Sequence, residues 1–230
     1  MIICVIPARG GSKRIPRKNI KLLGNKPLIS YTIDAAIKSE IFDEIYISTD
    51  DNNIIDYAKS KNVLIDERPK NLVGDNVTQV EVISEFIQRK KLLPSDQIAS
   101  LLPTCPFRTS KDIINAYEIF KRDISTPLIG VVAYEFPIQL ALSKKNKSNL
   151  MTPFFENGYK KTRSQDIEKT WHPNGAIYLA TVEQFLKNNS FFSSTMNTYE
   201  MDGLHSYDID YPWQFEIAQH LLKTLDNDET

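Results

Sequence analysis

Through the first 135 residues, short apolar runs alternate with segments in which apolar residues recur at helical spacing. This alternation constrains the fold more than any other feature of the sequence. The strand-like runs cover residues 1–5, 44–48, 63–65, 97–102 and 128–133. Between them, the spacing of apolar residues predicts helices over 27–39, 51–59, 78–90 and 110–122. Such alternation predicts an α/β fold with a mostly parallel sheet flanked by helices. Ligands in folds of this class bind beyond the carboxyl ends of the strands.

Residues that favour helix starts support these boundaries. Asp50 or Asp51 can cap the second helix, and Ser110 the fourth. Thr78, with Glu81 three residues later, forms a capping-box pattern before the third. After residue 175 the sequence predicts a strand over 176–180, a helix near 182–188, a short strand over 207–210 and a last helix from residue 212 to about 225.

The rhythm breaks between Glu135 and Lys169, a polar segment rich in Lys and Asn with no long helical pattern. From the residues alone, this segment is either an excursion that forms a hairpin and partner contacts or a plain surface insertion. The length of 230 residues suits one domain, 1–230, with this segment inserted at 135–169.

A basic loop follows the first strand and contains the paired glycines Gly10 and Gly11. Glycine lets backbone N–H groups approach an anion closely, and neighbouring cations add Coulomb attraction. The loop fits a nucleoside triphosphate, although a solvated basic loop is the ordinary alternative. The sequence lacks both GxxxxGK[ST] and GxGxxG, which argues against a P-loop ATPase or a dinucleotide dehydrogenase. The cations of this loop are Arg9, Lys13, Arg14, Arg17 and Lys18.

Asp208 and Asp210 are the second candidate site, because residues two apart in a strand point to the same face. Two carboxylates held on one face favour a hard divalent cation, and Mg²⁺ (or Mn²⁺) would bridge to triphosphate oxygens. The alternative for this pair is a loop that caps the last helix.

The overall composition excludes several other classes of protein. A net charge of −1 gives no support for generic nucleic-acid binding. Cys4 and Cys105 lie in apolar runs, which indicates buried free thiols and a reducing compartment. No stretch approaches the ~20 apolar residues of a membrane span, and the first apolar run is too short for a signal peptide. We therefore expect a cytoplasmic protein that binds neither nucleic acid nor membranes.

Seven motifs occur in the same order as in the acylneuraminate cytidylyltransferases, the CMP–sialic acid synthetases, and the chain resembles that family. They are Ile6–Asn19 (IPARGGSKRIPRKN), Ser48–Asp50 (STD), Arg68–Pro69, Pro103–Arg108 (PTCPFR), Arg163–Gln165 (RSQ), Asn174–Tyr178 (NGAIY) and Asp208–Asp210 (DID). The resemblance implies a Rossmann-like nucleotidyltransferase that joins CTP to an acidic nine-carbon 2-keto acid sugar. It also implies a homodimer formed through the excursion at 135–169.

The resemblance assigns roles to individual residues. The catalytic group comprises Arg9, Lys18, Asp208 and Asp210, and the last two also hold the metal. The nucleotide-binding group comprises Ala8, Arg9, Gly10, Lys13, Lys18, Asn19, Arg68 and Asp75. The sugar-binding group comprises Leu102, Arg163, Gln165, Tyr178, Phe191 and Phe192, with Arg163 on the sugar carboxylate and the two phenylalanines lining a neighbouring subunit's pocket. Without the resemblance, Arg163 would be an ordinary surface arginine, and Phe191 and Phe192 would be core or interface aromatics.

Leu102 departs from the family pattern, because sialic acid synthetases often carry a sugar-contacting Gln at this position. A leucine suits a sugar that is less polar there than N-acetylneuraminate, such as legionaminate or pseudaminate. A cytidylyltransferase for the eight-carbon acid Kdo is the near alternative, and a non-catalytic nucleotide-binding module is the distant one. The retained carboxylates, loop cations and Arg163 argue against the module.

Overall fold

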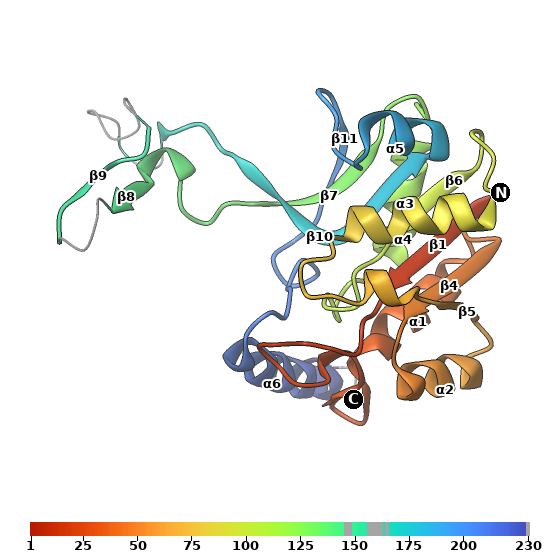
Figure 1. Ribbon diagram of the computed structural model, residues 1–230. Coiled ribbons are helices and arrows are strands. Elements are labelled where there is room, and N and C mark those ends of the chain that lie inside the picture. Colours follow the sequence, from red (N-terminus) through yellow and green to blue (C-terminus); the bar gives the residue numbers. More distant parts are fainter. Residues whose placement is uncertain (145–148, 156–162, 164–165, 229–230) are drawn as a thin grey trace.

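The structure, a computed structural model that describes residues 1–144, 149–155, 163 and 166–228, is built on a twisted central sheet (Figure 1). Within these residues, seven strands form the sheet in the order β11-β7-β10-β6-β1-β4-β5. The first four along the chain are β1 (Ile2–Pro7), β4 (Glu44–Thr49), β5 (Leu64–Glu67) and β6 (Gln97–Ser100). The others are β7 (Leu128–Ala133), β10 (Trp171–Thr181) and β11 (Asn197–Glu200). Every neighbouring pair is parallel except the two made by β10, so the predicted mostly parallel sheet is confirmed.

Helices cover both faces of this sheet, as the alternation predicts. On one face lie α1 (Leu28–Ser39), α2 (Asn52–Ser60) and α4 (Ser110–Phe120), whose apolar residues join one buried cluster. The other face carries α3 (Gln79–Lys90) and α5 (Val182–Asn188) over a second cluster. The last helix, α6 (Pro212–Asp228), packs with Leu28 and Phe107 over a third, smaller cluster. No helix of the described residues is both long and apolar enough to cross a membrane.

Two of the predicted helix starts are confirmed and a third is wrong by one residue. Asp51 accepts the N–H groups of residues 53 and 54 at the start of α2, and Thr78 forms a capping box with Glu81 at α3. The fourth helix is capped by Thr109 rather than Ser110. The Thr109 hydroxyl accepts the N–H of Asp112, and the Asp112 carboxylate accepts the N–H of Thr109.

The predicted strand over 207–210 is wrong, because among the residues that the structure describes no strand pairs with this segment. Its Ile209 N–H donates to the Thr104 carbonyl at 2.9 Å, and the chain then enters α6. The edge strand β11 has the short, largely polar sequence NTYE and contains no buried residue, so no hydrophobic pattern marks it in the sequence.

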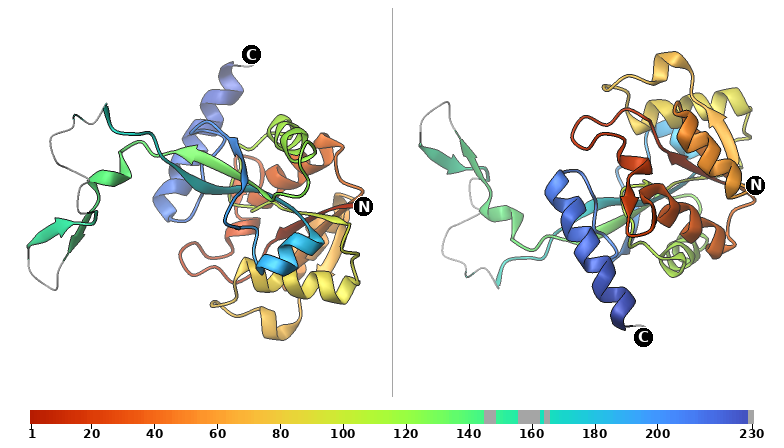
Figure 2. Two further views of the ribbon diagram at one scale, coloured as in Figure 1. Left: turned by 90° about the horizontal axis from the view of Figure 1, so that it is seen from above. Right: turned by 90° about the horizontal axis from the view of Figure 1, so that it is seen from below.

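The described residues of the segment 135–169 form an arm that stands away from the sheet in all views (Figures 1 and 2). It leaves the end of β7, passes through a short 3-10 turn at Ile138–Leu140, and forms the antiparallel pair β8 (Leu142–Lys144) and β9 (Met151–Pro153). Several large apolar side chains of the arm are exposed, including Phe136, Leu150 and Phe154. The hairpin is therefore observed, while its use in dimerisation stays a prediction.

The carboxyl ends of β1, β4, β5 and β6 meet at one edge of the sheet, because these neighbouring strands are parallel. The basic loop leaves β1 there, and Asp50, Arg68 and Leu102 follow the other three strands. This is the edge at which folds of this class bind their ligands.

Candidate active site

The basic loop is held by its own neighbours in a defined conformation. The Gly10 N–H donates to Asp50 Oδ1 at 2.8 Å, and Asn19 Nδ2 donates to the Arg9 carbonyl at 3.0 Å. A Cβ on Gly10 would lie 2.8 Å from the Cβ of Asp51, so the close approach of loop and helix α2 requires glycine there. Gly11 has no such neighbour. The loop is thus preorganised by Asp50 and Asn19.

Four loop cations pair with two carboxylates from distant parts of the chain. Arg9 and Lys13 contact Asp75 at 2.9 and 2.8 Å. Hydrogen bonding from Lys13, followed by its charge and that of Arg9, holds the pKa of Asp75 below its ordinary value.

On the other side of the loop, Arg14 Nη1 and Lys18 Nζ contact the two oxygens of Asp210 at 3.0 and 3.2 Å. Lys18 Nζ also donates to the Ile209 carbonyl at 2.6 Å, and only 12% of this side chain is exposed. Lys18 is therefore anchored to the segment that carries both aspartates, rather than extended into solvent.

Two adjoining cavities of about 280 and 290 Å³ lie between the basic loop and the aspartates. Arg9, Ser12, Lys18 and Asp210 line both of them. The first cavity is otherwise lined by Lys13, Arg14 and Asp75, and the second includes Asn19, Leu102, Thr104 and Asp208. The structure thus brings the two groups of residues that the sequence singled out into one place.

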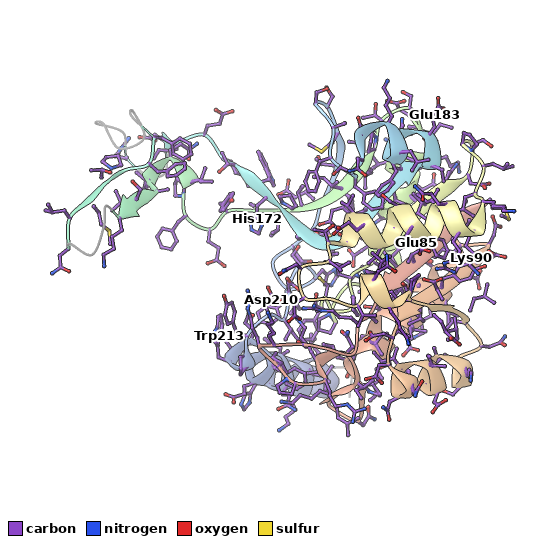
Figure 3. All side chains as sticks on the ribbon, viewed as in Figure 1. Glu85, Lys90, His172, Glu183, Asp210 and Trp213 are labelled. Carbon is purple, nitrogen blue, oxygen red and sulfur yellow. The ribbon has the colours of Figure 1, made fainter. Side chains whose placement is uncertain are left out.

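Asp208 and Asp210 line the second cavity, while Ile209 between them is fully buried in the cluster beneath α6. The alternation expected of a strand is kept although no strand forms. Figure 3 shows Asp210 just above the start of α6, below the strand that carries His172. Burial raises the pKa of Asp208, a hydrogen bond from the Thr104 side chain partly offsets this, and the charge of Asp210 raises the pKa further.

These residues fit a hard divalent cation. Both donors are carboxylate oxygens on one cavity wall, and burial raises the pKa of Asp208, so a cation bound beside it would stabilise its charged form. Among the described residues no group of three or more His, Cys, Asp or Glu side chains forms a complete metal site. A cation here would therefore take its remaining ligands from water and a bound phosphate.

Of the other residues expected to bind nucleotide, Asn19 lines the second cavity, whereas Ala8, Gly10 and Arg68 line neither. Asn19 Oδ1 is buried without a hydrogen-bond partner in the described part of the chain, so it is free to accept a donor. The Ala8 N–H is already used by the Ser48 carbonyl at 2.8 Å. Arg68 donates from Nη2 to the same carbonyl at 2.9 Å, and burial lowers the pKa of its guanidinium.

The six residues expected to bind sugar are only partly brought together. Leu102 lines the second cavity. Tyr178 is 7% exposed and packs against Phe191, which is 2% exposed and also contacts Phe185. Phe191 thus occupies the core in this chain, whereas Phe192 is 43% exposed and open to a ligand or partner.

Arg163 lies on the exposed arm and pairs with Asp166 at 2.9 Å. Gln165 lies outside the described residues. Arg163 therefore contacts neither cavity within its own chain.

Two further residues belong to the site. The resemblance assigns Arg14 no role, yet Arg14 binds Asp210 and stacks its guanidinium over Tyr211 at 4.6 Å. The Thr104 side chain hydrogen-bonds Asp208. Nothing in the sequence pattern around Arg14 indicates a partner almost two hundred positions away, whereas Thr104 lies within the PTCPFR motif and could have been singled out.

Comparison with known proteins places the chain among enzymes of one type. A model of the cytidylyltransferase family matches residues 3–221. A pseudaminic acid cytidylyltransferase of Campylobacter jejuni is 38% identical over 96% of both chains. A CMP-N,N'-diacetyllegionaminic acid synthase of Legionella pneumophila is 33% identical, also over 96% of both. An N-acylneuraminate cytidylyltransferase of Escherichia coli is 34% identical over 94% of this chain and 51% of its own length.

Among solved structures, a CMP:2-keto-3-deoxy-manno-octonic acid synthetase complexed with CTP matches with a TM-score of 0.71 at 17% identity, covering 97% of this chain and 98% of its own. This likeness concerns the fold alone, and it confirms the predicted Rossmann-like α/β architecture. The family model spans nearly the whole sequence, and relatives above 30% identity match over almost their full length. The chain therefore belongs to the cytidylyltransferase family.

Proposed function

We propose that this enzyme transfers CMP from CTP to the anomeric hydroxyl of a nine-carbon 2-keto acid sugar and releases pyrophosphate. The observation that carries the proposal is the convergence of four loop cations and two aspartates on adjoining cavities at the carboxyl edge of the sheet. The names of the relatives support the reactants, because they specify cytidylyl transfer to pseudaminic, N-acylneuraminic and legionaminic acids.

The loop cations would bind the triphosphate of CTP. In the free enzyme they are neutralised by Asp75 and Asp210, so an incoming triphosphate takes over the role of those carboxylates. Lys18 is the candidate for contact with the α-phosphate, because it is the least exposed of the four and lies against the aspartates. Fixed cations stabilise charge that develops on the phosphoryl oxygens during in-line substitution without having to reorganise.

Asp208 and Asp210 would hold a Mg²⁺ or Mn²⁺ ion. When bound, this cation supplies further positive charge to the triphosphate and polarises the phosphorus that is attacked. Asp208 is the more buried of the two carboxylates, and in the free enzyme Lys18 and Arg14 pair with Asp210 until the triphosphate takes them over.

The sugar pocket would be completed by a second copy of the chain. Asp208 also lines a larger cavity of about 620 Å³ on the side of β7, β10 and β11. That cavity contains Glu135, Glu200 and Asp202 as well, so it offers an acidic sugar little positive charge of its own. Arg163 on the projecting arm would supply the bidentate partner for the sugar carboxylate across a homodimer interface.

Pseudaminate is our first choice of substrate, followed by legionaminate. Leu102 at the second cavity suits the less polar of the nine-carbon sugars, and the 38% identity to a pseudaminic acid cytidylyltransferase points the same way. A cytoplasmic location belongs to the same proposal and is supported by the two buried free thiols, Cys4 and Cys105.

Pyrophosphate release tests this function. The enzyme is mixed with CTP and Mg²⁺, alone and then with pseudaminate, legionaminate, N-acetylneuraminate or Kdo. We expect release only when a sugar is present, with the highest kcat/KM for pseudaminate. Highest kcat/KM for N-acetylneuraminate would overturn the choice of sugar, and CTP binding without release for any sugar would favour a non-catalytic module.

A further inference from the structure

Two consecutive backbone N–H groups beside the aspartates converge on one side-chain oxygen. The N–H groups of Asp210 and Tyr211 both donate to Gln214 Oε1 at 2.7 Å. Gln214 is the third residue of α6 and is half-buried. The amide oxygen of glutamine has two lone pairs and can accept both bonds, whereas the Nε2 group of the same side chain can only donate.

The two hydrogen bonds to Gln214 complete a set of bonds that fixes the backbone around Asp210. The preceding Ile209 N–H donates to the Thr104 carbonyl at 2.9 Å, and Lys18 Nζ donates to the Ile209 carbonyl at 2.6 Å. Three consecutive N–H groups are thus held, one by the loop after β6 and two by Gln214. Removing Gln214 would release the backbone of Asp210 while leaving Asp208 with its own partner, Thr104.

A helix cap alone would not need this arrangement. In an ordinary capping box the third residue of the helix accepts only the N–H of the capping residue. Gln184 does this at α5, where its Oε1 accepts the Thr181 N–H at 3.4 Å. Gln214 makes the same bond at α6 and adds the bond to Asp210, one residue further out and directly at a cavity-lining carboxylate.

We propose that Gln214 is a positioning residue that holds Asp210 in the orientation needed to bind the divalent cation, an inference that rests on the proposed function. It acts on the metal site through the backbone of Asp210, and its side chain also lines the larger cavity proposed for the sugar, so Mn²⁺ binding measured without sugar isolates the positioning role. Groups that orient metal ligands in this way typically change metal affinity by about 10–100-fold when they are lost.

The experiment compares three variants of the full chain. Gln214→Leu keeps the approximate size but removes the acceptor, and Gln214→Glu keeps an acceptor oxygen. Gln184→Leu is the matched control, because it removes the same kind of capping bond from a helix whose residues line neither cavity. Free Mn²⁺ is measured by electron paramagnetic resonance in the presence of CDP, together with kcat for cytidylyl transfer and the melting temperature.

Gln214→Leu should weaken Mn²⁺ binding by about tenfold or more and lower kcat, while Gln214→Glu stays near wild type. Gln184→Leu should lower the melting temperature without changing Mn²⁺ affinity. Equal Mn²⁺ affinity in Gln214→Leu and Gln184→Leu would overturn the proposal, as would a Gln214→Glu variant as weak as Gln214→Leu or a wild type that binds no Mn²⁺. Mn²⁺ binding requires no turnover. An enzyme that binds Mn²⁺ but does not transfer CMP to any sugar would therefore contradict the proposed reaction and leave the role of Gln214 intact.

Discussion

Replacing Lys18 with methionine should separate the chemical role of its charge from its structural role. The substitution keeps an apolar stem of similar length and removes the ammonium group. If Lys18 contacts the α-phosphate, its loss removes one preorganised electrostatic contact, which typically costs about 10²–10³-fold in kcat.

The structural cost can be worked out from the contacts that Lys18 makes. It loses a 2.6 Å hydrogen bond to the Ile209 carbonyl and a 3.2 Å ion pair with Asp210, while Asp210 keeps Arg14 at 3.0 Å. Loss of a hydrogen bond that involves a charged group costs roughly 1.5–3 kcal/mol in unfolding free energy. For a chain of this size each kcal/mol lowers the melting temperature by about 2–4 °C, so we expect a loss of roughly 3–12 °C.

The assay measures kcat and the KM for CTP at a temperature well below the lowered melting point, with the melting temperature measured in parallel. Lys38→Met is the control, because Lys38 is exposed on α1 and lines neither cavity. A Lys18→Met enzyme that is destabilised as expected but keeps kcat within about threefold of wild type would refute the chemical role, because one such contact is worth at least about a hundredfold.

Three further predictions follow from the ion pairs, the buried carboxylate and the arm. Burial raises the pKa of Asp208 in the folded protein, so its stabilising contribution is present below the unfolded pKa and lost as pH rises through the folded pKa. Asp208→Asn should therefore raise the melting temperature of the metal-free enzyme near neutral pH, and the gain should shrink as the pH falls towards the ordinary carboxyl pKa. A lower melting temperature at neutral pH would contradict this. Asp75→Asn removes the carboxylate that competes for Arg9 and Lys13, and should lower the KM for CTP by about two- to fivefold at low salt; a higher KM would show that Asp75 itself binds nucleotide. Light scattering should give about twice the chain mass of 26.4 kDa, and a fully active monomer would exclude a shared sugar pocket.

Local sequence signals were sufficient to predict most of the sheet and helices. Helix α3 was found because its apolar spacing and its capping box agree, and β4 because EIYIS is an apolar run before an aspartate. Strand β11 was missed because an edge strand with polar, exposed residues carries no hydrophobic pattern. The segment over 207–210 has a strand-like pattern, but no strand in the described part of the chain pairs with it, which only the tertiary structure reveals.

The candidate site was predictable as two separate groups of residues but not as one network. Motif order placed the cations and the aspartates near the same ligand, whereas the bond between Arg14 and Asp210 joins positions 196 residues apart. The role of Gln214 depends on backbone N–H groups, which leave no mark in side-chain motifs. Phe191, which the resemblance assigns to a neighbouring subunit's sugar pocket, lies in the hydrophobic core of its own chain. Its burial depends on tertiary packing and could not be predicted from the motif.

The central claim is that the basic loop and the aspartate pair form one site for metal-dependent cytidylyl transfer. Its most direct test follows radiolabel from α-³²P-CTP into CMP-sugar with pseudaminate and Mg²⁺, for wild type and for the Asp208→Asn, Asp210→Asn double variant. We expect label in CMP-sugar for wild type, none after EDTA, and a rate at least about 10²-fold lower for the double variant. A double variant that remains folded and transfers label at the wild-type rate would contradict the claim and leave the pair as a helix cap.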